Sequence, residues 1–482
     1  MGCGKTKEKT LVAITIDTPR LKIHKTLIWK HPKSFYEEYQ SGNKIGTGGF
    51  AEVRRCTHKT TCQMRAVKIY YKNLFTADYV SSNGFHNEIE IFRRIDHPNL
   101  VKVYEYFEDE KCFYITMEFC KGGELFEKVS NKTKIPERTV CLIMKQILSI
   151  VSYLHEKLIV HRDIKPENIL LEDRDGDFHI KIADFGNAIF FSKAQNIKGQ
   201  AGTSYYMSPE VIDSEYSEKC DEWSCGVIMF MLITGCPPFI GNSDDEIISN
   251  VKKQEYSLEN PSFATISHEA KDLIKSLLTP ENNRLSAADA LKHPWFELFK
   301  EKQGLQTTSD FYMKIQENIR NYRPSCNFKD AIKAFIISHV MGDKDIRPVR
   351  DVFMFLDEDH DGKIDDHDIG KYMNKSFKDG GNEGQINIFK YFEGETRGFL
   401  EYNEFLRVAL EDSLILTKKN VLMAFGMLDW YKNGVVTAEM LMAAIESNAK
   451  DVEIWKNMIE ETFRKKDGSF GIRQICEMIE GG

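Results

Sequence analysis

One eight-residue segment, His161 to Asn168, constrains this chain more than any other part of its sequence. It places a carboxylate at Asp163, an ammonium at Lys165 and an amide at Asn168. Pro166 stiffens the loop that carries them. This set suits phosphoryl transfer, since Asp163 can accept a proton from an attacking hydroxyl, Lys165 can neutralise the moving phosphoryl group, and Asn168 can hold a metal ion. The octet alone is also compatible with a polar surface loop, so the rest of the sequence must decide.

Length and composition indicate a multidomain globular protein. A length of 482 residues predicts about three domains. Hydrophobic residues make up 42% and charged residues 29%, a balance typical of soluble proteins with several cores. No apolar run approaches the roughly 20 residues that span a bilayer, and the polar start is unlike a signal peptide. The 11 cysteines lack metal-type spacing, which predicts reduced cytosolic thiols.

Charge is distributed unevenly along the chain. The net charge is −8, but residues 330–482 carry 29 acidic and 20 basic side chains, which leaves the preceding residues near +1. An acidic C-terminal third argues against nucleic acid as a partner. It favours cations or a basic peptide segment instead.

The first residues fit a lipidation pattern. Gly2 follows the initial methionine in the arrangement recognised for N-myristoylation, and Cys3 is a candidate for a second acyl group. Lysines at positions 5, 7 and 9 add attraction to anionic lipid. Two such signals together predict a stable anchor at the cytosolic face of a membrane. The alternative is an accidental Gly2 in a disordered segment.

A second group of motifs precedes the octet. A glycine-rich turn spans residues 45–53, where glycines let backbone N–H groups approach phosphates. Lys68 ends a short apolar strand, and Glu88 lies on a helix predicted for residues 85–95. A strand lysine paired with a helix glutamate can hold nucleotide phosphates. Either residue alone would be read as a surface charge, but their order ahead of the octet favours a site.

Further motifs follow the octet. The segment 182–186 supplies Asp184 as a second metal-binding carboxylate. Residues 173–177 look like part of a calcium loop, but they lie between two apolar runs, and we interpret them as a hairpin turn. Residues 137–157 have helical periodicity and are predicted to form core. The remaining motifs are Gly202-Thr203-x-x-Tyr206-Met207-Ser208-Pro209-Glu210, Asp221-x-Trp223-Ser224-x-Gly226-Val227 and Arg284.

In this order and at these separations, residues 39–296 resemble a eukaryotic protein kinase domain of the serine/threonine branch. The resemblance implies an α+β bilobal kinase fold in which Asp163 is the catalytic base and Lys165 contacts phosphate, while Mg²⁺ is held by Asn168 and Asp184. Residues expected at the ATP site are Ile45, Gly46, Gly48, Val53, Ala66, Lys68, Glu88, Met117, Glu118 and Glu124. Glu124 and Glu167 also match positions that favour a basic residue in the substrate, upstream of the phosphorylated hydroxyl.

Three positions depart from the family pattern: Ala51, Ser208 and Asn187. The first two exchange one small residue for another. Asn187 replaces a usual apolar residue and leaves the choice between serine and threonine open. Arg162 would pair with a phosphate on the activation loop, for which the candidates are Ser192, Thr203 and Ser204.

Residues 297–341 form a junction. A helical stripe predicted from Phe311 to Tyr322 ends before Pro324, and a second stripe runs from Phe328 to Val340. One interpretation is local packing of two helices. The other is an autoinhibitory segment that blocks the kinase and is gripped by the acidic region.

Residues 342–482 contain an internal repeat. Glycines recur at 362, 398, 434 and 468, each followed two residues later by an apolar side chain. This is the helix–loop–helix phase of an all-α, calmodulin-like domain of four EF-hands. The predicted loops are 357–368, 393–404, 429–440 and 463–474.

Only the first loop keeps a full set of calcium ligands. These are Asp357, Asp359, Asp361, the Lys363 carbonyl, Asp365 and Asp368. Asp368 stands where glutamate is usual, which predicts weakened affinity or a shift towards Mg²⁺. The other loops carry unsuitable residues and are interpreted as structural. The unsuitable residues are Arg397, Tyr431, Met440, Phe463 and Lys465.

Kinase, junction and four hands in one chain resemble the calcium-dependent protein kinases of the plant and protist type. The resemblance implies ATP, Mg²⁺ and Ca²⁺ as cofactors, protein substrates with serine or threonine near basic residues, and a monomer without nucleic-acid partners. Two alternatives stay open from the residues: a calcium-insensitive kinase whose hands are a structural clamp, and a non-catalytic scaffold that binds nucleotide and cations.

Overall fold

The computed structural model describes residues 26–49, 51–76, 83–130, 135–173, 178–259, 261–299, 313–315, 317–319, 328–365, 367–368, 398–445, 452–464 and 466–480. Several predicted features lie outside these residues: the acylation sites Gly2 and Cys3, the turn at 174–177, and residues 393–397 at the start of the second calcium loop. Acylation and the membrane location that follows from it stay predictions. Within the described residues, no helix combines the length and apolar character that a membrane span requires.

The first lobe is a six-stranded sheet in the order β1-β5-β6-β4-β3-β2. Helix α3 carries five buried residues towards this sheet. The elements of the lobe are β1 (Trp29–Lys30), α1 (Phe35–Glu38), β2 (Tyr39–Thr47), β3 (Ala51–His58), β4 (Met64–Tyr71), η1 (Lys72–Leu74), α3 (Gly84–Arg94), β5 (Val103–Glu108) and β6 (Cys112–Glu118). Strands β2 to β6 pair antiparallel, as expected for a sheet built from hairpins.

Strand β1 was not predicted from the sequence. It pairs parallel with β5, with Trp29 opposite Glu105, so part of the expected N-terminal extension belongs to the kinase sheet. Leu27 and Trp29 also pack into the core of the C-terminal region, and Trp29 stacks on Trp430 with ring centroids 5.3 Å apart. The segment therefore joins two parts of the molecule that are distant in sequence.

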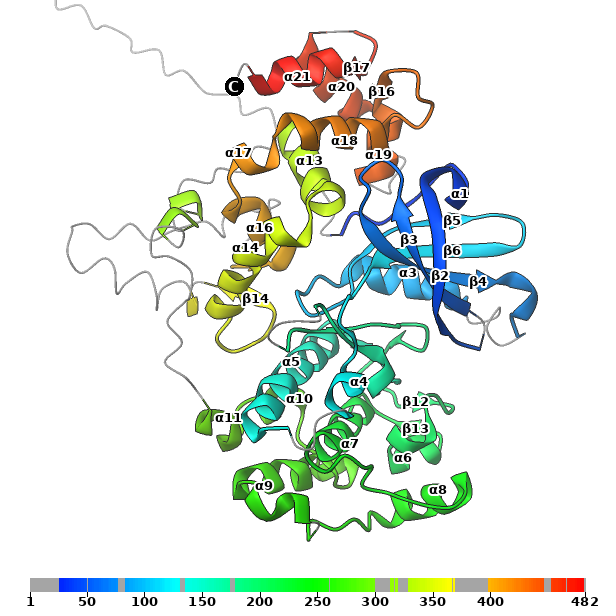
Figure 1. Cartoon of the computed structure of the whole chain (residues 1–482), viewed down its shortest axis with the longest axis vertical. Coiled ribbons are helices and arrows are strands. Elements are labelled where there is room, and N and C mark those ends of the chain that lie inside the picture. The colour runs from blue at the N-terminus through cyan, green and yellow to red at the C-terminus, as the bar shows by residue number, and fades with distance from the viewer. Residues whose placement is uncertain are drawn as a thin grey trace, which may run out of the picture.

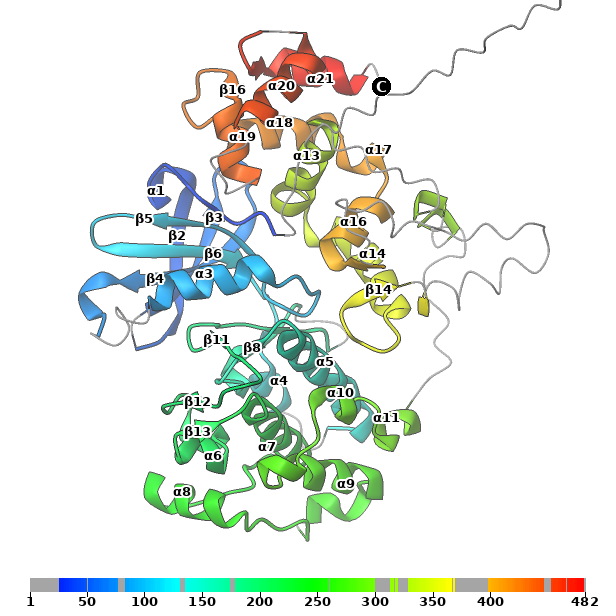
Figure 2. The ribbon, with the colours of Figure 1, turned by 180° about the vertical axis from the view of Figure 1, so that it is seen from behind.

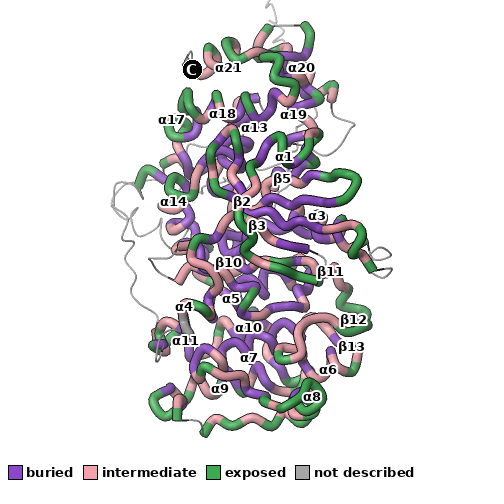
Figure 3. Tube along the Cα trace, turned by 45° about the vertical axis from the view of Figure 1, so that its right-hand side comes forward, coloured by how far each residue is buried: buried purple, intermediate pink, exposed green. Residues whose placement is uncertain are grey.

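The second lobe is mainly helical (Figure 1). Helices α5 and α7 form its centre, and most of their residues are buried (Figure 3). Strands β9 and β10 pair antiparallel, so the predicted hairpin that follows the octet is confirmed. The elements are β7 (Gly123–Glu124), α4 (Leu125–Ser130), α5 (Glu137–Glu156), β8 (Ile159–Val160), η2 (Pro166–Asn168), β9 (Ile169–Leu171), β10 (Ile180–Ile182), β11 (Ile189–Phe190), β12 (Ile197–Lys198), η3 (Ser204–Tyr206), α6 (Pro209–Ile212), β13 (Glu215–Tyr216), α7 (Cys220–Thr234), α8 (Asp244–Lys253), η4 (Pro261–Thr265), α9 (His268–Leu277), η5 (Glu281–Asn283), α10 (Ala287–Ala290) and α11 (Pro294–Leu298).

The C-terminal region is a set of helices joined by loops with short strands. Strands β14 and β15 pair through Ile364 and Leu400, and β16 and β17 pair through Val436 and Phe470. The glycine repeat predicted these apolar pairs. The elements are α13 (Phe328–Phe335), the π-helix η6 (Ile336–Val340), α14 (Asp343–Leu356), β14 (Lys363–Asp365), β15 (Phe399–Glu401), α16 (Tyr402–Ala409), α17 (Asp412–Ile415), α18 (Lys418–Leu428), β16 (Val435–Thr437), α19 (Ala438–Ile445), α20 (Val452–Phe463), β17 (Ser469–Gly471) and α21 (Ile472–Glu480).

The loop glycines explain why the repeat is visible in the sequence. Gly362, Gly398, Gly434 and Gly468 have φ values between +60° and +80°, a backbone conformation that side chains with a Cβ rarely adopt. Each loop can therefore turn sharply only where glycine stands. The predicted bilobal α+β fold followed by a helical region is confirmed, and both views of the ribbon show that region beside the first lobe (Figures 1 and 2).

Candidate functional site

The catalytic loop gathers polar groups around the Asp163 carboxylate. Lys165 Nζ donates a 2.8 Å hydrogen bond to Oδ2 of Asp163, and the Asn168 amide donates to its backbone oxygen at 2.8 Å. Thr203 of the later loop donates to Oδ1 at 3.3 Å and accepts from Lys165 Nζ at 3.0 Å. The carboxylate is thus held in place by groups from two segments, while its residue stays 8% exposed.

Asp221, at the start of α7, fixes the backbone of the catalytic loop. Its carboxylate accepts the N–H groups of His161 and Arg162 at 2.8 and 2.9 Å. It also pairs with His155, whose pKa is raised to about 10 because the carboxylates of Glu222 and Asp221 outweigh the effect of burial. The sequence motif around Asp221 did not reveal this contact, because the two segments lie about 60 residues apart.

Lys68 connects the first lobe to the second metal carboxylate. Its Nζ lies 3.1 Å from Oε1 of Glu88 on α3 and 2.7 Å from Oδ1 of Asp184. Burial opposes the charge of Lys68, but the two carboxylates outweigh it, so the pKa of this ammonium lies above its usual range. The same ammonium lowers the pKa of Asp184 to about 2. The backbone N–H of Ala183 donates to the Asn168 carbonyl at 2.9 Å, which brings the two predicted Mg²⁺ ligands to neighbouring positions.

Most of the predicted nucleotide residues lie on four adjacent strands, β2, β3, β4 and β6. Gly46 pairs with Val53 across β2 and β3, and Ala66 of β4 pairs with Met117 of β6. Gly48 donates its N–H to Ala51 at 2.7 Å, which closes the turn between β2 and β3. Ile45, also in β2, has 52% of its surface exposed. Their role in binding ATP stays a prediction.

Glu118 is the last residue of β6, and its side-chain carboxylate already has partners within the protein. Oε2 pairs with Lys181 at 3.1 Å and accepts the Lys102 N–H at 3.3 Å. Its amide donates to the Lys102 carbonyl at 2.8 Å. Any contact of Glu118 with adenine must therefore come from its backbone carbonyl.

Two glutamates lie on adjacent elements at the catalytic loop. Glu124 lies in β7 and Glu167 in η2, and these two elements pack together. Burial, reinforced by Glu127 and Glu167, raises the pKa of Glu124 above its usual value. A basic side chain placed between them would relieve this repulsion.

Two contacts to Asp163 were missed in the sequence. The Asn187 amide donates to Oδ2 of Asp163 at 3.4 Å, and Thr203 bonds both Asp163 and Lys165. A phosphate on Thr203 would place like charge against the catalytic carboxylate, so Thr203 is a poor candidate for an activating modification. Arg162 instead donates to the Asn187 carbonyl at 2.7 Å and to Tyr216 Oη at 3.3 Å.

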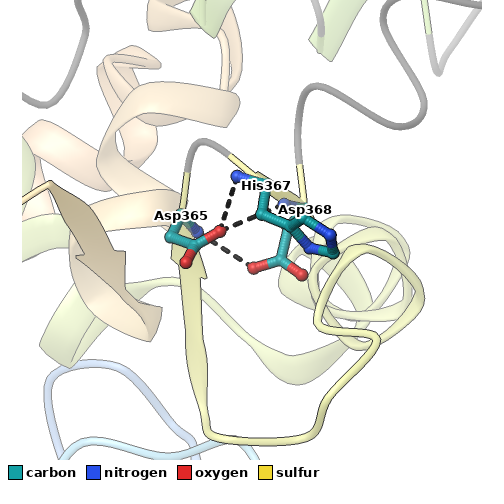
Figure 4. Close-up of side chains that lie close together, drawn as sticks. All are labelled: Asp365, His367 and Asp368. Carbon is teal, nitrogen blue, oxygen red and sulfur yellow. Dashed lines mark hydrogen bonds between the residues drawn. The ribbon is translucent and has the colours of Figure 1, made fainter.

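The first calcium loop brings its acidic ligands together. One oxygen each from Asp357, Asp359 and Asp361 lies within 4.8 Å of the others, and Asp365, His367 and Asp368 form a second such set. Figure 4 shows that Asp365 accepts both the His367 and Asp368 N–H groups, while Asp368 accepts the Asp365 N–H at 3.0 Å. His367 was not predicted as a member.

The electrostatics of this loop favour a bound cation. Burial and the neighbouring carboxylates raise the pKa of Asp357 well above its usual value. Burial, with further carboxylates nearby, also raises the pKa of Asp361 and that of Asp368 to about 6. A divalent cation would relieve the repulsion, and oxygen ligands of this type suit Ca²⁺ or Mg²⁺. The residues fit the predicted ion.

The third loop has the same backbone hydrogen bonds as the first loop, although Tyr431 and Met440 occupy two of its ligand positions. Asp429 accepts the N–H groups of Asn433 and Gly434 at 3.1 and 2.8 Å, as Asp357 accepts those of Asp361 and Gly362 at 3.1 Å each. In every loop the residue at position 12 accepts the N–H of position 9. These acceptors are Asp368, Glu404, Met440 and Gln474. This loop shape therefore does not by itself require a cation.

The first loop also touches the kinase core. Ser149 of α5 donates to the His360 carbonyl at 2.8 Å, and Lys363 pairs with Glu156 at 2.6 Å. A Cβ on Gly362 would lie 2.7 Å from His97, so the loop packs closely on the back of the first lobe. A cation bound to the first loop would therefore lie next to α5.

The junction also contacts the first lobe. Arg65 of β4 donates to the His339 carbonyl at 2.8 Å, and Gln63 donates to the Val340 carbonyl at 2.7 Å. Phe328 packs edge-on against Phe463 and Phe470 of the C-terminal region. No hydrogen bond or ion pair joins the described junction residues to the catalytic loop. The second predicted stripe thus packs between the first lobe and the C-terminal region, and its autoinhibitory role stays a prediction.

Comparisons with known proteins agree with this architecture. The family model described as "Protein kinase domain" matches residues 39–296. The chain is similar to "Calcium-dependent protein kinase 3" of Plasmodium berghei (strain Anka), with 37% identity over 449 residues that cover 91% of this chain and 79% of the relative. It is also similar to "Calcium-dependent protein kinase 4" of Plasmodium falciparum (isolate 3D7), with 32% identity over 458 residues that cover 92% and 87%.

A third relative, "Calcium-dependent protein kinase 5" of the same Plasmodium falciparum isolate, is 33% identical over 443 residues that cover 91% of this chain and 77% of the relative. The similarity extends over the kinase lobes, the junction and the C-terminal helices alike. The bilobal fold, the polar groups around Asp163 and these full-length relatives together show that the chain belongs to the calcium-dependent protein kinases and is a serine/threonine protein kinase.

Proposed function

We propose that Asp163 accepts the proton of a substrate serine or threonine hydroxyl while the γ-phosphoryl group of ATP passes to that oxygen. The observation that carries this is the Asp163 carboxylate, held by Lys165, Thr203 and Asn168 beside the Lys68–Asp184 pair. Bound Mg²⁺, held by Asn168 and Asp184, would neutralise phosphate charge. Lys165 neutralises charge on the transferred group, and Lys68 holds the nucleotide phosphates. The bond formed joins the hydroxyl oxygen to phosphorus, and the bond to ADP breaks.

We further propose that Glu124 and Glu167 select a basic residue upstream of the phosphorylated hydroxyl. Their position on the adjacent elements β7 and η2, and the effect of Glu167 on the pKa of Glu124, support this choice. A serine peptide with arginine at the upstream position should be phosphorylated with a lower KM than the same peptide with alanine there. A Glu124→Gln, Glu167→Gln double variant should reduce this preference by about tenfold, while kcat on the alanine peptide is unchanged. An undiminished preference would assign the selection to other residues.

We also propose that calcium regulates the kinase through the loop 357–368. The loop that carries the cluster of Asp357, Asp359 and Asp361 packs against α5, which supports this proposal. The rival function, a calcium-insensitive kinase with a structural clamp, is favoured by the third loop, which forms the same turn with Tyr431 and Met440 at two ligand positions. The non-catalytic scaffold has no such observation in its favour.

Calorimetry and kinase assays at controlled free calcium separate the two. Wild-type protein should bind calcium at this loop and change its activity, and EGTA should reverse the change. Asp357→Asn keeps one acceptor oxygen for the Asp361 and Gly362 N–H groups, which now bond the two oxygens of Asp357, and it loses the charge, so this binding should disappear. Asp429→Asn, the equivalent change in the third loop, is the matched control and should leave binding unchanged. Activity that ignores both EGTA and Asp357→Asn would establish the clamp.

The same calorimetry has an expected pH dependence. Protons compete with calcium for Asp361 and Asp368, whose pKa values are about 6. Calcium affinity should therefore fall by about tenfold between roughly pH 7.5 and 5.5. An affinity that does not change over this interval would show that these two carboxylates are not ligands.

A further inference from the structure

Tyr70 lies beside the Lys68–Glu88 pair, although the sequence motifs did not single it out. It follows Lys68 by two residues in β4, and side chains at that spacing in a strand lie on the same face of the sheet. Tyr70 is 3% exposed, and Nζ of Lys68 lies 4.8 Å from the centroid of its ring. The Tyr70 hydroxyl donates a hydrogen bond to Oε2 of Glu88. The residue therefore contacts both members of the pair.

The two oxygens of the Glu88 carboxylate have different donors. Oε1 accepts from Nζ of Lys68 at 3.1 Å, and Oε2 accepts from Tyr70. The terminal torsion of a glutamate has broad minima, so a carboxylate held at one oxygen can rotate, whereas bonds to both oxygens fix its plane. Glu88 is 1% exposed, so water has little access to replace a lost donor. Tyr70 thus determines how Glu88 presents Oε1 to Lys68.

Lys68 is shared between Glu88 and Asp184, the carboxylate predicted to hold Mg²⁺. Nζ of Lys68 lies 2.7 Å from Oδ1 of Asp184. A carboxylate that binds Mg²⁺ attracts the ammonium less strongly, which leaves Glu88 as the countercharge that orients Lys68. A Cβ on Gly186 would lie 3.7 Å from the Tyr70 hydroxyl oxygen, so this hydroxyl also lies close to the segment that carries Asp184.

The ring of Tyr70 and its hydroxyl have separable roles. The ring packs edge-on against Phe75 and Phe85, with centroids 6.5 and 5.7 Å away. A phenylalanine at this position would keep both contacts and would also keep its ring beside Lys68. A buried hydroxyl costs free energy unless it is hydrogen-bonded, so the hydroxyl contributes through its hydrogen bonding and not through packing.

Helix α3 has a further bond to the segment after Gly186, and this bond does not involve Tyr70. Nδ2 of Asn87, the residue before Glu88, donates to the Ala188 carbonyl at 2.8 Å. The helix should therefore keep its place when the Tyr70 hydroxyl is removed. What the hydroxyl adds is the orientation of one carboxylate on that helix.

We propose that Tyr70 is a positioning residue for phosphoryl transfer: its hydroxyl fixes the Glu88 carboxylate, and Glu88 in turn holds the Lys68 ammonium where it meets the nucleotide phosphates. This inference rests on the role proposed above for Lys68. Tyr70 acts through Glu88 and takes no part in bond formation. Its loss therefore weakens the interactions of the enzyme with ATP and leaves those with the protein substrate unchanged.

Tyr70→Phe in the full-length protein tests the hydroxyl. The variant should lower kcat/KM for Mg²⁺–ATP by about tenfold and weaken the affinity for a labelled ATP analogue in a fluorescence titration, while KM for a serine peptide stays the same. Tyr71→Phe is the matched control, because it removes a hydroxyl that donates to Glu52 at 2.7 Å on the opposite face of the same strand. The control should match wild type in all three measurements. If Tyr70→Phe also matches wild type, or if Tyr71→Phe shows the same loss, the proposal is wrong.

A double-mutant cycle tests whether Tyr70 acts through Glu88. Glu88→Met removes both acceptor oxygens and keeps an unbranched side chain. In this background Tyr70→Phe should change kcat/KM for Mg²⁺–ATP by less than about twofold, because the hydroxyl has no carboxylate to orient. A loss that stays near tenfold would show that Tyr70 acts independently of Glu88 and would overturn the proposal.

Lys68→Met separates a failure of this inference from a failure of the role proposed for Lys68. If Lys68→Met loses activity and Tyr70→Phe does not, the positioning role of Tyr70 alone is wrong. If Lys68→Met is fully active, the role of Lys68 is wrong, and the role of Tyr70 falls with it.

Discussion

Asp163→Asn should lower kcat by about 10²- to 10⁴-fold and leave ATP affinity nearly unchanged. The asparagine can keep an acceptor for Lys165, which now donates to Asp163 Oδ2 at 2.8 Å, so the loop should retain its shape. It cannot accept the proton of an attacking hydroxyl. The reacting oxygen then stays a poor nucleophile even though substrate and nucleotide are bound.

Steady-state kinetics on a serine peptide and fluorescence titration with a labelled ATP analogue give the two quantities. Asp213→Asn is a suitable control, because Asp213 pairs with Lys252 on an exposed surface where its side chain is 64% accessible. That variant should match wild type in both measurements. A fully active Asp163→Asn protein would remove Asp163 from the chemistry, and a loss of ATP binding would assign it a nucleotide role.

Lys68→Met should reduce kcat/KM by at least about a hundredfold, since it removes a charged donor aimed at the nucleotide phosphates. It should also destabilise the fold. Glu88 is 1% exposed and depends on Lys68, 3.1 Å away, for its countercharge. Leaving one member of a buried ion pair alone costs about 3–5 kcal/mol.

The destabilisation in Lys68→Met should depend on pH. Burial raises the pKa of Glu88 above its usual value, and the Lys68 ammonium opposes that rise. Without Lys68 the pKa rises further, so the folded protein binds a proton at a pH where the unfolded chain releases it. Folded-state stability is then greatest at low pH and decreases as pH rises.

Denaturant unfolding at about pH 5 and pH 8 measures this slope. The unfolding free energy of Lys68→Met should fall more between the two values than that of wild type. Lys72→Met, which changes a lysine that pairs with Glu108 on the surface of the same lobe, should follow the wild-type slope. Equal slopes in all three proteins would mean that Lys68 does not control the charge of Glu88.

Local sequence signals predicted the elements that carry the chemistry. The octet, Lys68, Glu88 and Asp184 were recognised from their order, and the structure brings all of them together. The EF-hand loops were recognised in the same way, because positive φ at each sixth position requires glycine and the strand that follows requires an apolar residue. Each signal depends on backbone geometry within a few residues, and a single sequence contains that information.

Contacts between distant segments could not be predicted in this way. Asn187 and Thr203 approach Asp163 from 24 and 40 residues away, and neither residue type signals such a role. Trp29 pairs with Glu105 through β1 and stacks on Trp430 of the C-terminal region, two contacts between segments far apart in the sequence. The stripe from Phe328 to Val340 predicted that one face of the junction is buried, but not which surface buries it.

The sequence by itself identified a kinase with an EF-hand region, and it predicted the residues of phosphoryl transfer and one loop suited to a cation. Only the tertiary structure decided that this loop lies against α5 and that the described junction contacts the first lobe. Motifs can be read from a sequence because the backbone turns and side-chain sets that they encode lie within a few residues of one another. Docking depends on complementary surfaces assembled from segments far apart in the sequence, such as those that carry Glu172 and Arg350. Neither hydrophobic periodicity nor motif spacing in a single sequence reveals which surfaces are complementary.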